Sequence, residues 1–113
     1  MYNTLCNTQT TQTPVIYSLS QTVIPQGEYT SIGVNGINFV YGAGNTNAYI
    51  TSLADGTRLA IPCAFYSSLN CAFVVPVALP TGQYSVEIGI KYRIYGSTVV
   101  SQAFSNVLIF QVV

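Results

Sequence analysis

Hydrophobic and polar residues alternate most regularly between Tyr84 and Tyr95. The even positions are apolar or aromatic, and the odd positions are mostly polar or charged: Tyr84, Val86, Ile88, Ile90, Tyr92 and Ile94 against Ser85, Glu87, Gly89, Lys91 and Arg93. Successive side chains of a strand point to opposite faces, so this pattern predicts a strand with one dry face and one wet face. A helix would leave no continuous apolar stripe with this spacing.

Other strand-like stretches lie between turn signals along the chain. We expect strands at 14–20, 29–35, 48–53, 58–66, 69–75, 98–102 and 103–113. Asp55-Gly56 is typical of a tight hairpin, and Pro25-Gln26-Gly27 is typical of a turn. About seven antiparallel strands, with turns every 8–12 residues or so and no helical period, predict an all-β protein and a β-sandwich.

The length and the polarity of the chain predict one domain preceded by an arm. With 113 residues the chain has room for a single core. Residues 1–13 are almost wholly Asn, Thr and Gln, which predicts a flexible polar N-terminal arm, and the domain then covers 14–113. The N-terminal residues lack a secretory signal pattern, and no apolar run is long enough for a membrane span.

Charge is scarce and balanced. Charged residues make up 5% of the sequence and the net charge is zero, whereas about 25% is typical of soluble domains. A chain with so few cations cannot neutralise several phosphates, which argues against nucleic acid as a partner. The surface must then be covered by uncharged polar residues and tyrosine, which suits a protein packed among neighbours or exposed outside cells better than a free cytosolic enzyme.

The residue types do not favour an enzyme. The chain has no histidine, and its three carboxylates, Glu28, Asp55 and Glu87, fall on a turn, a hairpin tip and a wet strand face. We therefore expect no catalytic residue, no cofactor and no metal site. Cys63 and Cys71 could face each other across adjacent strands, or both could be buried thiols that act as small hydrophobes.

Several turn and core motifs occur in an order that resembles the IPT/TIG (immunoglobulin-like, plexin, transcription factor) domain family. They are Pro14–Leu19, Pro25–Gly27, Gly36–Phe39, Phe73–Pro76, Gly82–Val86 and Ser105–Asn106. Gly36-Ile37-Asn38-Phe39 matches the family's most recognisable element, Gly-x-Asn-Phe. The resemblance covers 14–113 and implies an immunoglobulin-like β-sandwich that serves in spacing, docking and binding. The segment Lys91 to Gln102 is longer than the family norm, which predicts a protruding hairpin.

Candidate contact residues come from three places. The arm contributes Tyr2 and Cys6, loops and the expected hairpin contribute Tyr41, Arg93 and Tyr95, and the last strand contributes Ile109 and Val113. Both faces of the last strand are apolar, so either this strand is central and covered on both sides, or its outer face meets another protein.

The leading hypothesis is a non-enzymatic structural interaction protein, in particular a minor capsid or cement protein of a large virus particle. Its partners would be other capsid proteins, its location the virion, and self-association is possible in such an assembly. The alternative is a carbohydrate- or surface-binding module located outside the cell or on its surface. A third reading, a dimerising module of an intracellular regulator, is weakened by the lack of basic residues.

Overall fold

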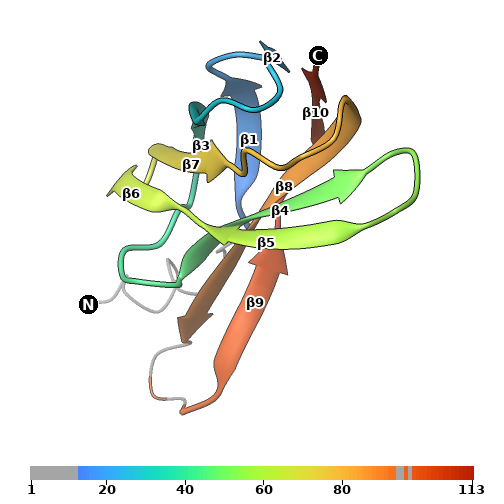
Figure 1. Cartoon of the computed structure of the whole chain (residues 1–113). Helices are drawn as coiled ribbons and strands as arrows, with labels where there is room; N and C mark the ends of the chain where they lie inside the picture. Colours follow the sequence, from blue (N-terminus) through green and yellow to red (C-terminus); the bar gives the residue numbers. More distant parts are fainter. Residues whose placement is uncertain (1–12, 94–95, 97) are drawn as a thin grey trace.

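The protein is all-β, with two sheets packed on each other in a sandwich-like arrangement (Figure 1). The computed structural model describes residues 13–93, 96 and 98–113. None of these residues belongs to a helix, so no helical membrane span occurs in this part of the chain. The strands, in chain order, are β1 (Val15–Leu19), β2 (Val23–Ile24), β3 (Thr30–Ile37), β4 (Thr46–Ser52), β5 (Arg58–Pro62), β6 (Ala64–Ser67), β7 (Asn70–Val75), β8 (Gly82–Arg93), β9 (Val100–Phe104) and β10 (Leu108–Val112).

The two sheets are unequal. One has four strands in the order β1-β3-β7-β6, and the other has the order β2-β10-β8-β4-β5 with β9 added beside β8. β8 pairs with β10 through its first half and with β9 through its second half, while β4 lies along its opposite edge. The β2–β10 pair is parallel, whereas each of the other described pairs is antiparallel.

The all-β, two-sheet prediction is confirmed, but the expected number of about seven strands is wrong, because the described residues form ten. The predicted strand at 58–66 divides at Cys63, where the chain passes from the six-stranded sheet to the four-stranded one. The predicted strand at 103–113 is interrupted between Phe104 and Leu108, which separates β9 from β10. β2 was not predicted; it is only two residues long and comes just before the expected turn at Pro25–Gly27.

The alternation in β8 has the predicted consequence. Val86, Ile88 and Ile90 are completely buried between the sheets, and Tyr84 is 5% exposed. They pack in one cluster with apolar side chains of the facing strands, among them Ile32, Val34, Phe39, Phe73 and Phe110. Burial of each large apolar side chain contributes about 1.5–3 kcal/mol, so this cluster is the main source of stability.

The Gly-x-Asn-Phe element has a structural role at the end of β3. Asn38 adopts a left-handed backbone conformation with φ of 67°, and its side-chain amide donates to the carbonyl of Thr13 at 2.8 Å. This turn directs Phe39 into the core. Gly36 is packed so tightly that a Cβ there would collide with the carbonyl oxygen of Val15 and lie 2.7 Å from Cζ of Phe39.

The Ser-Asn element connects the two sheets. The backbone N–H of Ile16 in β1 donates to Oδ1 of Asn106 at 2.8 Å, and Nδ2 of Asn106 donates to the Ile16 carbonyl at 3.0 Å. The backbone N–H of Ser105 donates to the carbonyl of Ile88 in β8, and the N–H of Ile88 donates to Oγ of Ser105, both at 2.8 Å. The break between β9 and β10 is thus stabilised by hydrogen bonds to both sheets.

The expected hairpin is present. β8 and β9 pair as far as Arg93 and Val100, and Figure 1 shows their far ends extending beyond the four-stranded sheet.

Replacement of Gly36 by Ala should lower the free energy of unfolding by about 1–3 kcal/mol, because the new Cβ overlaps backbone atoms of β1. Gly33→Ala is the matched control on the same strand, since its Cβ would lie 3.5 Å from the nearest atom, on Ser20. That control should be neutral or stabilising by up to about 1 kcal/mol. Urea denaturation measures both variants, and equal effects would show that the close approach at Gly36 is not a constraint.

Asn106→Ala should destabilise the protein by about 1–3 kcal/mol, because the N–H and carbonyl of Ile16 both lose their side-chain partner. Gln102→Ala on β9, where the side chain is exposed, should change stability by less than about 0.5 kcal/mol. Thermal or urea unfolding provides the comparison. If the two variants unfold alike, Asn106 does not tie the sheets together.

Candidate functional site

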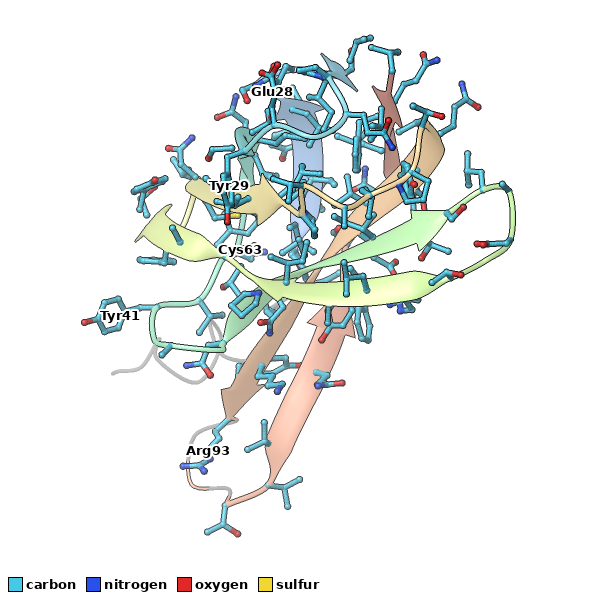
Figure 2. All side chains as sticks on the ribbon, viewed as in Figure 1. Glu28, Tyr29, Tyr41, Cys63 and Arg93 are labelled. Carbon is cyan, nitrogen blue, oxygen red and sulfur yellow. The ribbon has the colours of Figure 1, made fainter. Side chains whose placement is uncertain are left out.

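The structure does not gather the candidate contact residues in one place. Tyr2, Cys6 and Tyr95 lie outside the described residues. Tyr41 is 81% exposed in the loop between β3 and β4, where its ring packs edge-on against Phe65 with centroids 5.6 Å apart. Figure 2 shows Tyr41 at one side of the molecule and Arg93 on the projecting hairpin.

Ile109 and Val113, the remaining candidates, are exposed at β10 and just after it. Phe110 and Val112 on the same strand are buried in the core, so the strand has one dry inner side. Its outer side is exposed, with Ile109 44% accessible in the part of the chain that the structure describes.

The carboxylates lie apart from one another. Glu28 is exposed between β2 and β3, and Glu87 forms an ion pair with Arg58 at 2.7 Å. The Thr57 N–H donates to Oδ1 of Asp55 at 2.9 Å, and this bond lowers the pKa of Asp55. Among the described residues, no group of three or more His, Cys, Asp or Glu side chains could hold a metal ion.

The side of the six-stranded sheet that points away from the four-stranded sheet, here called the outer face, carries the odd-numbered residues of β8. Their neighbours on adjacent strands follow from the register: Tyr49 lies opposite Glu87, Phe104 opposite Gly89, and Ile109 opposite Ser85. The outer face also carries all three cationic side chains of the chain. Lys91 and Arg93 are odd-numbered residues of β8, and Arg58 on β5 lies opposite Thr51 on β4.

Two aromatic rings lie directly over Gly89 on the outer face. A Cβ on Gly89 would be 2.5 Å from Cε2 of Tyr49 and 2.8 Å from Cε1 of Phe104. The rings meet edge to face, with centroids 5.4 Å apart, and the Arg58 guanidinium carbon lies 4.8 Å from the Tyr49 centroid. The result is a row of side chains in contact from Phe104 through Tyr49 to Arg58, which is in turn paired with Glu87.

Sequence reasoning missed the contact between Tyr49 and Phe104. The available signal was Gly89, since a glycine inside a strand often marks a place where other groups approach closely. Gly89 stood on the predicted wet face, but nothing local in the sequence indicates which side chains cover it.

Five apolar side chains on or beside the outer face remain between 42% and 55% exposed. They belong to β2, β9, β10 and the segment between the last two strands, and together we call them the apolar strip: Val23, Val100, Phe104, Val107 and Ile109. Single exposed hydrophobic residues are common, but several on neighbouring strands are typical of an interaction surface.

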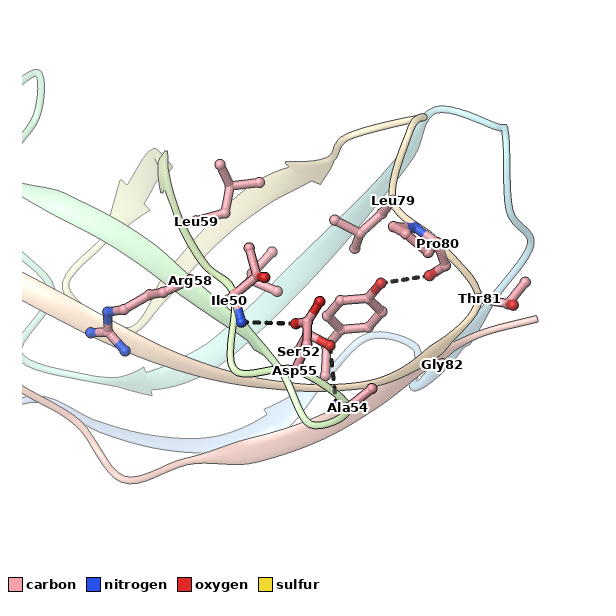
Figure 3. A pocket seen from close by; sticks show the side chains of 12 residues that line it. Ile50, Ser52, Ala54, Asp55, Arg58, Leu59, Leu79, Pro80, Thr81 and Gly82 are labelled. Carbon is pink, nitrogen blue, oxygen red and sulfur yellow. Dashed lines mark hydrogen bonds between the residues drawn. The ribbon is translucent and has the colours of Figure 1, made fainter.

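A separate pocket of about 290 Å³ lies at the start of β8, between the β4–β5 turn and the loop before β8 (Figure 3). Ile50, Leu59, Leu79 and Tyr84 give it an apolar lining. The Tyr84 hydroxyl donates to the Pro80 carbonyl at 2.6 Å, and burial raises the pKa of Tyr84, with a further contribution from the charge of Asp55. The pocket can accommodate a small apolar group, but its lining offers no activated nucleophile.

No family model matches the sequence, and no curated protein matches it. The structure is similar to the crystal structure of a protein from Bacteroides vulgatus ATCC 8482 that is named as a candidate bacterial DNA-binding protein. The TM-score is 0.59 at 15% sequence identity, and the similarity covers 80% of this chain and 40% of the bacterial one. At this identity the likeness supports the fold alone.

A double-mutant cycle with Arg58→Met and Glu87→Gln should give a coupling energy of about 0.2–1 kcal/mol, as for exposed pairs. The Arg58 side chain is 46% exposed, so the coupling should fall in about 1 M NaCl, where the Debye length is about 3 Å. Urea unfolding of the four proteins at low and high salt measures it. A salt-independent coupling above about 2 kcal/mol would mean that this pair stabilises the fold and is not available to a partner.

Proposed function

We propose that this chain is a non-enzymatic structural interaction protein that docks onto another protein through the outer face of its six-stranded sheet. The observation that carries this proposal is the apolar strip, whose five side chains are all at least 42% exposed. Apolar residues on adjacent strands gain free energy when a partner removes them from water, at about 25 cal/mol per Å² of buried apolar surface.

The charges and the apolar side chains of the outer face indicate which kind of partner surface would fit it. Arg58 and Glu87 neutralise each other, which leaves Lys91 and Arg93 as the cations without a carboxylate among the described ion pairs. A partner therefore needs an apolar surface with polar groups around it, rather than a strongly acidic one. Because apolar contacts and hydrogen bonds are less sensitive to salt than ion pairs, the complex should survive high ionic strength.

Within this class, we propose a minor capsid or cement protein of a large virus particle, with other capsid proteins as partners and the virion as its location. The low charge supports this proposal, because a protein held among neighbours does not need charge to stay dispersed. The projecting β8–β9 hairpin also supports it, since it offers a second contact beyond the sandwich.

We further propose that the sandwich is immunoglobulin-like and of the IPT/TIG type. Its strand order supports this, because β1-β3-β7-β6 and β10-β8-β4 correspond to the A-B-E-D and G-F-C orders of immunoglobulin sheets. The family-like motifs are used for turns and for contacts between the sheets, so they support a fold and do not identify a ligand.

A carbohydrate-binding module outside the cell or on its surface is a second candidate. The pair formed by Tyr49 and Phe104 favours it, because the exposed Phe104 ring could stack on the apolar face of a sugar beside the polar pair Arg58–Glu87. Saturable binding on a glycan array that is lost in Phe104→Ala would support this candidate over the first.

The charges of this chain do not support the DNA-binding function in the bacterial protein's name. The described cations that could meet phosphates are Arg58, Lys91 and Arg93, and the first is already paired with Glu87. Two remaining cations would neutralise about two phosphates, too few to supply the electrostatic term on which DNA binding depends.

Density-gradient sedimentation of the native source material, with this chain followed by mass spectrometry, tests the assembly. The chain should migrate with a large particle at fixed stoichiometry, and about 1 M NaCl should not release it. A chain that stays at the top of the gradient as a free small protein would contradict the proposal.

The docking surface is tested by rebinding of the recombinant protein to particles from which the native chain has been stripped. Ile109→Lys places a charge in the apolar strip and should weaken rebinding at least about tenfold, equivalent to about 1.4 kcal/mol. Tyr17→Lys is the matched control, because Tyr17 is 62% exposed on β1 of the other sheet. Equal rebinding of the two variants would exclude the outer face.

A further inference from the structure

Two cysteines face each other where the chain changes sheets. Cys71 is a core residue of β7 and is 1% exposed, and Cys63 is half-buried between β5 and β6. Phe65 lies opposite Cys71 and Ala64 opposite Ala72, so Cys63 stands one residue before this pairing begins. Figure 2 labels Cys63 at the crossing between β5 and β6.

Both thiols are free, and Cys63 packs against the core cluster that contains Cys71. Because the two side chains are neighbours, side-chain rotation and a small backbone adjustment can bring the sulfur atoms to the disulfide distance of about 2.05 Å. The contact with Cys71 and the burial of Cys63 raise the pKa of Cys63. The Cys63 thiol is therefore protonated at neutral pH.

A small molecule can reach one of the two sulfur atoms. A pocket of about 200 Å³ is lined by Tyr41, Gly42, Ala43, Cys63 and Phe65. Cys71 does not line it and lies in the core. This difference in access assigns different parts to the two cysteines in a thiol–disulfide exchange, in which one thiol attacks first and the other resolves the intermediate.

We propose that Cys63 and Cys71 are a redox pair that closes to an intramolecular disulfide by exchange with a small disulfide such as oxidised glutathione. Cys63 loses its proton to water and attacks one glutathione sulfur, which gives a mixed disulfide and releases one glutathione thiolate. Cys71 then loses its proton and attacks the Cys63 sulfur, which releases the second glutathione. Two protein thiols are oxidised to one disulfide, and one glutathione disulfide is reduced to two thiols.

The bond would fix the edge of the sandwich. β5 belongs to the six-stranded sheet and β6 to the four-stranded sheet, so a link from Cys63 to β7 would hold the crossing segment in place. The chain would fold with free thiols in a reducing compartment and become more stable after exposure to oxidant. This inference is independent of the docking surface, because neither cysteine belongs to the apolar strip.

The test uses the full chain with Cys6→Ser, which removes the third thiol. After incubation with oxidised glutathione, the protein is acid-quenched, unfolded and treated with N-ethylmaleimide, and its intact mass is measured. Neither Cys63 nor Cys71 should be alkylated. Both should be alkylated when the oxidised protein is first reduced. The reaction should be faster at about pH 9 than at about pH 7, since it needs the thiolate. The oxidised protein should melt at least about 5 °C higher than the reduced protein.

Two variants in the Cys6→Ser background are the controls. Adding Cys63→Ala, at the half-buried position, should leave Cys71 alkylatable and abolish the rise in melting temperature. Adding Cys71→Ala should stop the reaction at the mixed disulfide of Cys63 with glutathione. Alkylation of both cysteines after oxidant treatment, or a disulfide that joins two chains instead of closing within one, would overturn the proposal.

Discussion

The two faces of strand β8 lie in different surroundings, since one packs in the core and the other lies on the outer face. Its inner side chains, Val86, Ile88 and Ile90, are completely buried between the sheets, while Glu87 and Lys91 alternate with them on the outer face. A shift by one residue would exchange the two sets, placing charges in the core and apolar groups in water. Because β4, β9 and β10 all pair with β8, its register fixes the positions of the aromatic pair and of the apolar strip.

Much of the fold could be predicted from local patterns. The alternation in β8 and the core position of Phe39 each follow from a few neighbouring residues, and both are observed. The hairpin was expected from the length of the segment Lys91 to Gln102, and the pairing of β8 with β9 is observed. The changes of sheet could not be predicted in this way. The break at Cys63 and the interruption at Ser105 depend on partners distant in sequence, such as the hydrogen bonds from Asn106 to Ile16.

The candidate surface was harder to predict than the fold. Tyr49 and Phe104 read as ordinary strand residues, and they form a cluster only because β4 and β9 lie on opposite sides of Gly89. Ile109 was identified because both faces of its strand are apolar, a signal that the sequence does contain. Tyr41 and Arg93 are exposed as expected, but they lie on separate parts of the molecule.

The structure separates the residues that hold the fold from those that are free to make contacts. Gly36, Asn38 and Asn106, which carry the resemblance to a domain family, serve close packing and links between strands. The outer face contributes little to the core, yet it carries the chain's cations and the apolar strip. We propose contact with a partner as the function of this exposed apolar surface on a protein with 5% charged residues.

Hydroxyl-radical footprinting of the chain in its native assembly and as a free protein tests this account most directly. Phe104 and Ile109 should be protected in the assembly, whereas Tyr17 and Tyr66, exposed on the four-stranded sheet, should be labelled equally in both states. Equal labelling of Phe104 and Ile109 in the two states, or protection confined to the four-stranded sheet, would contradict docking through the outer face.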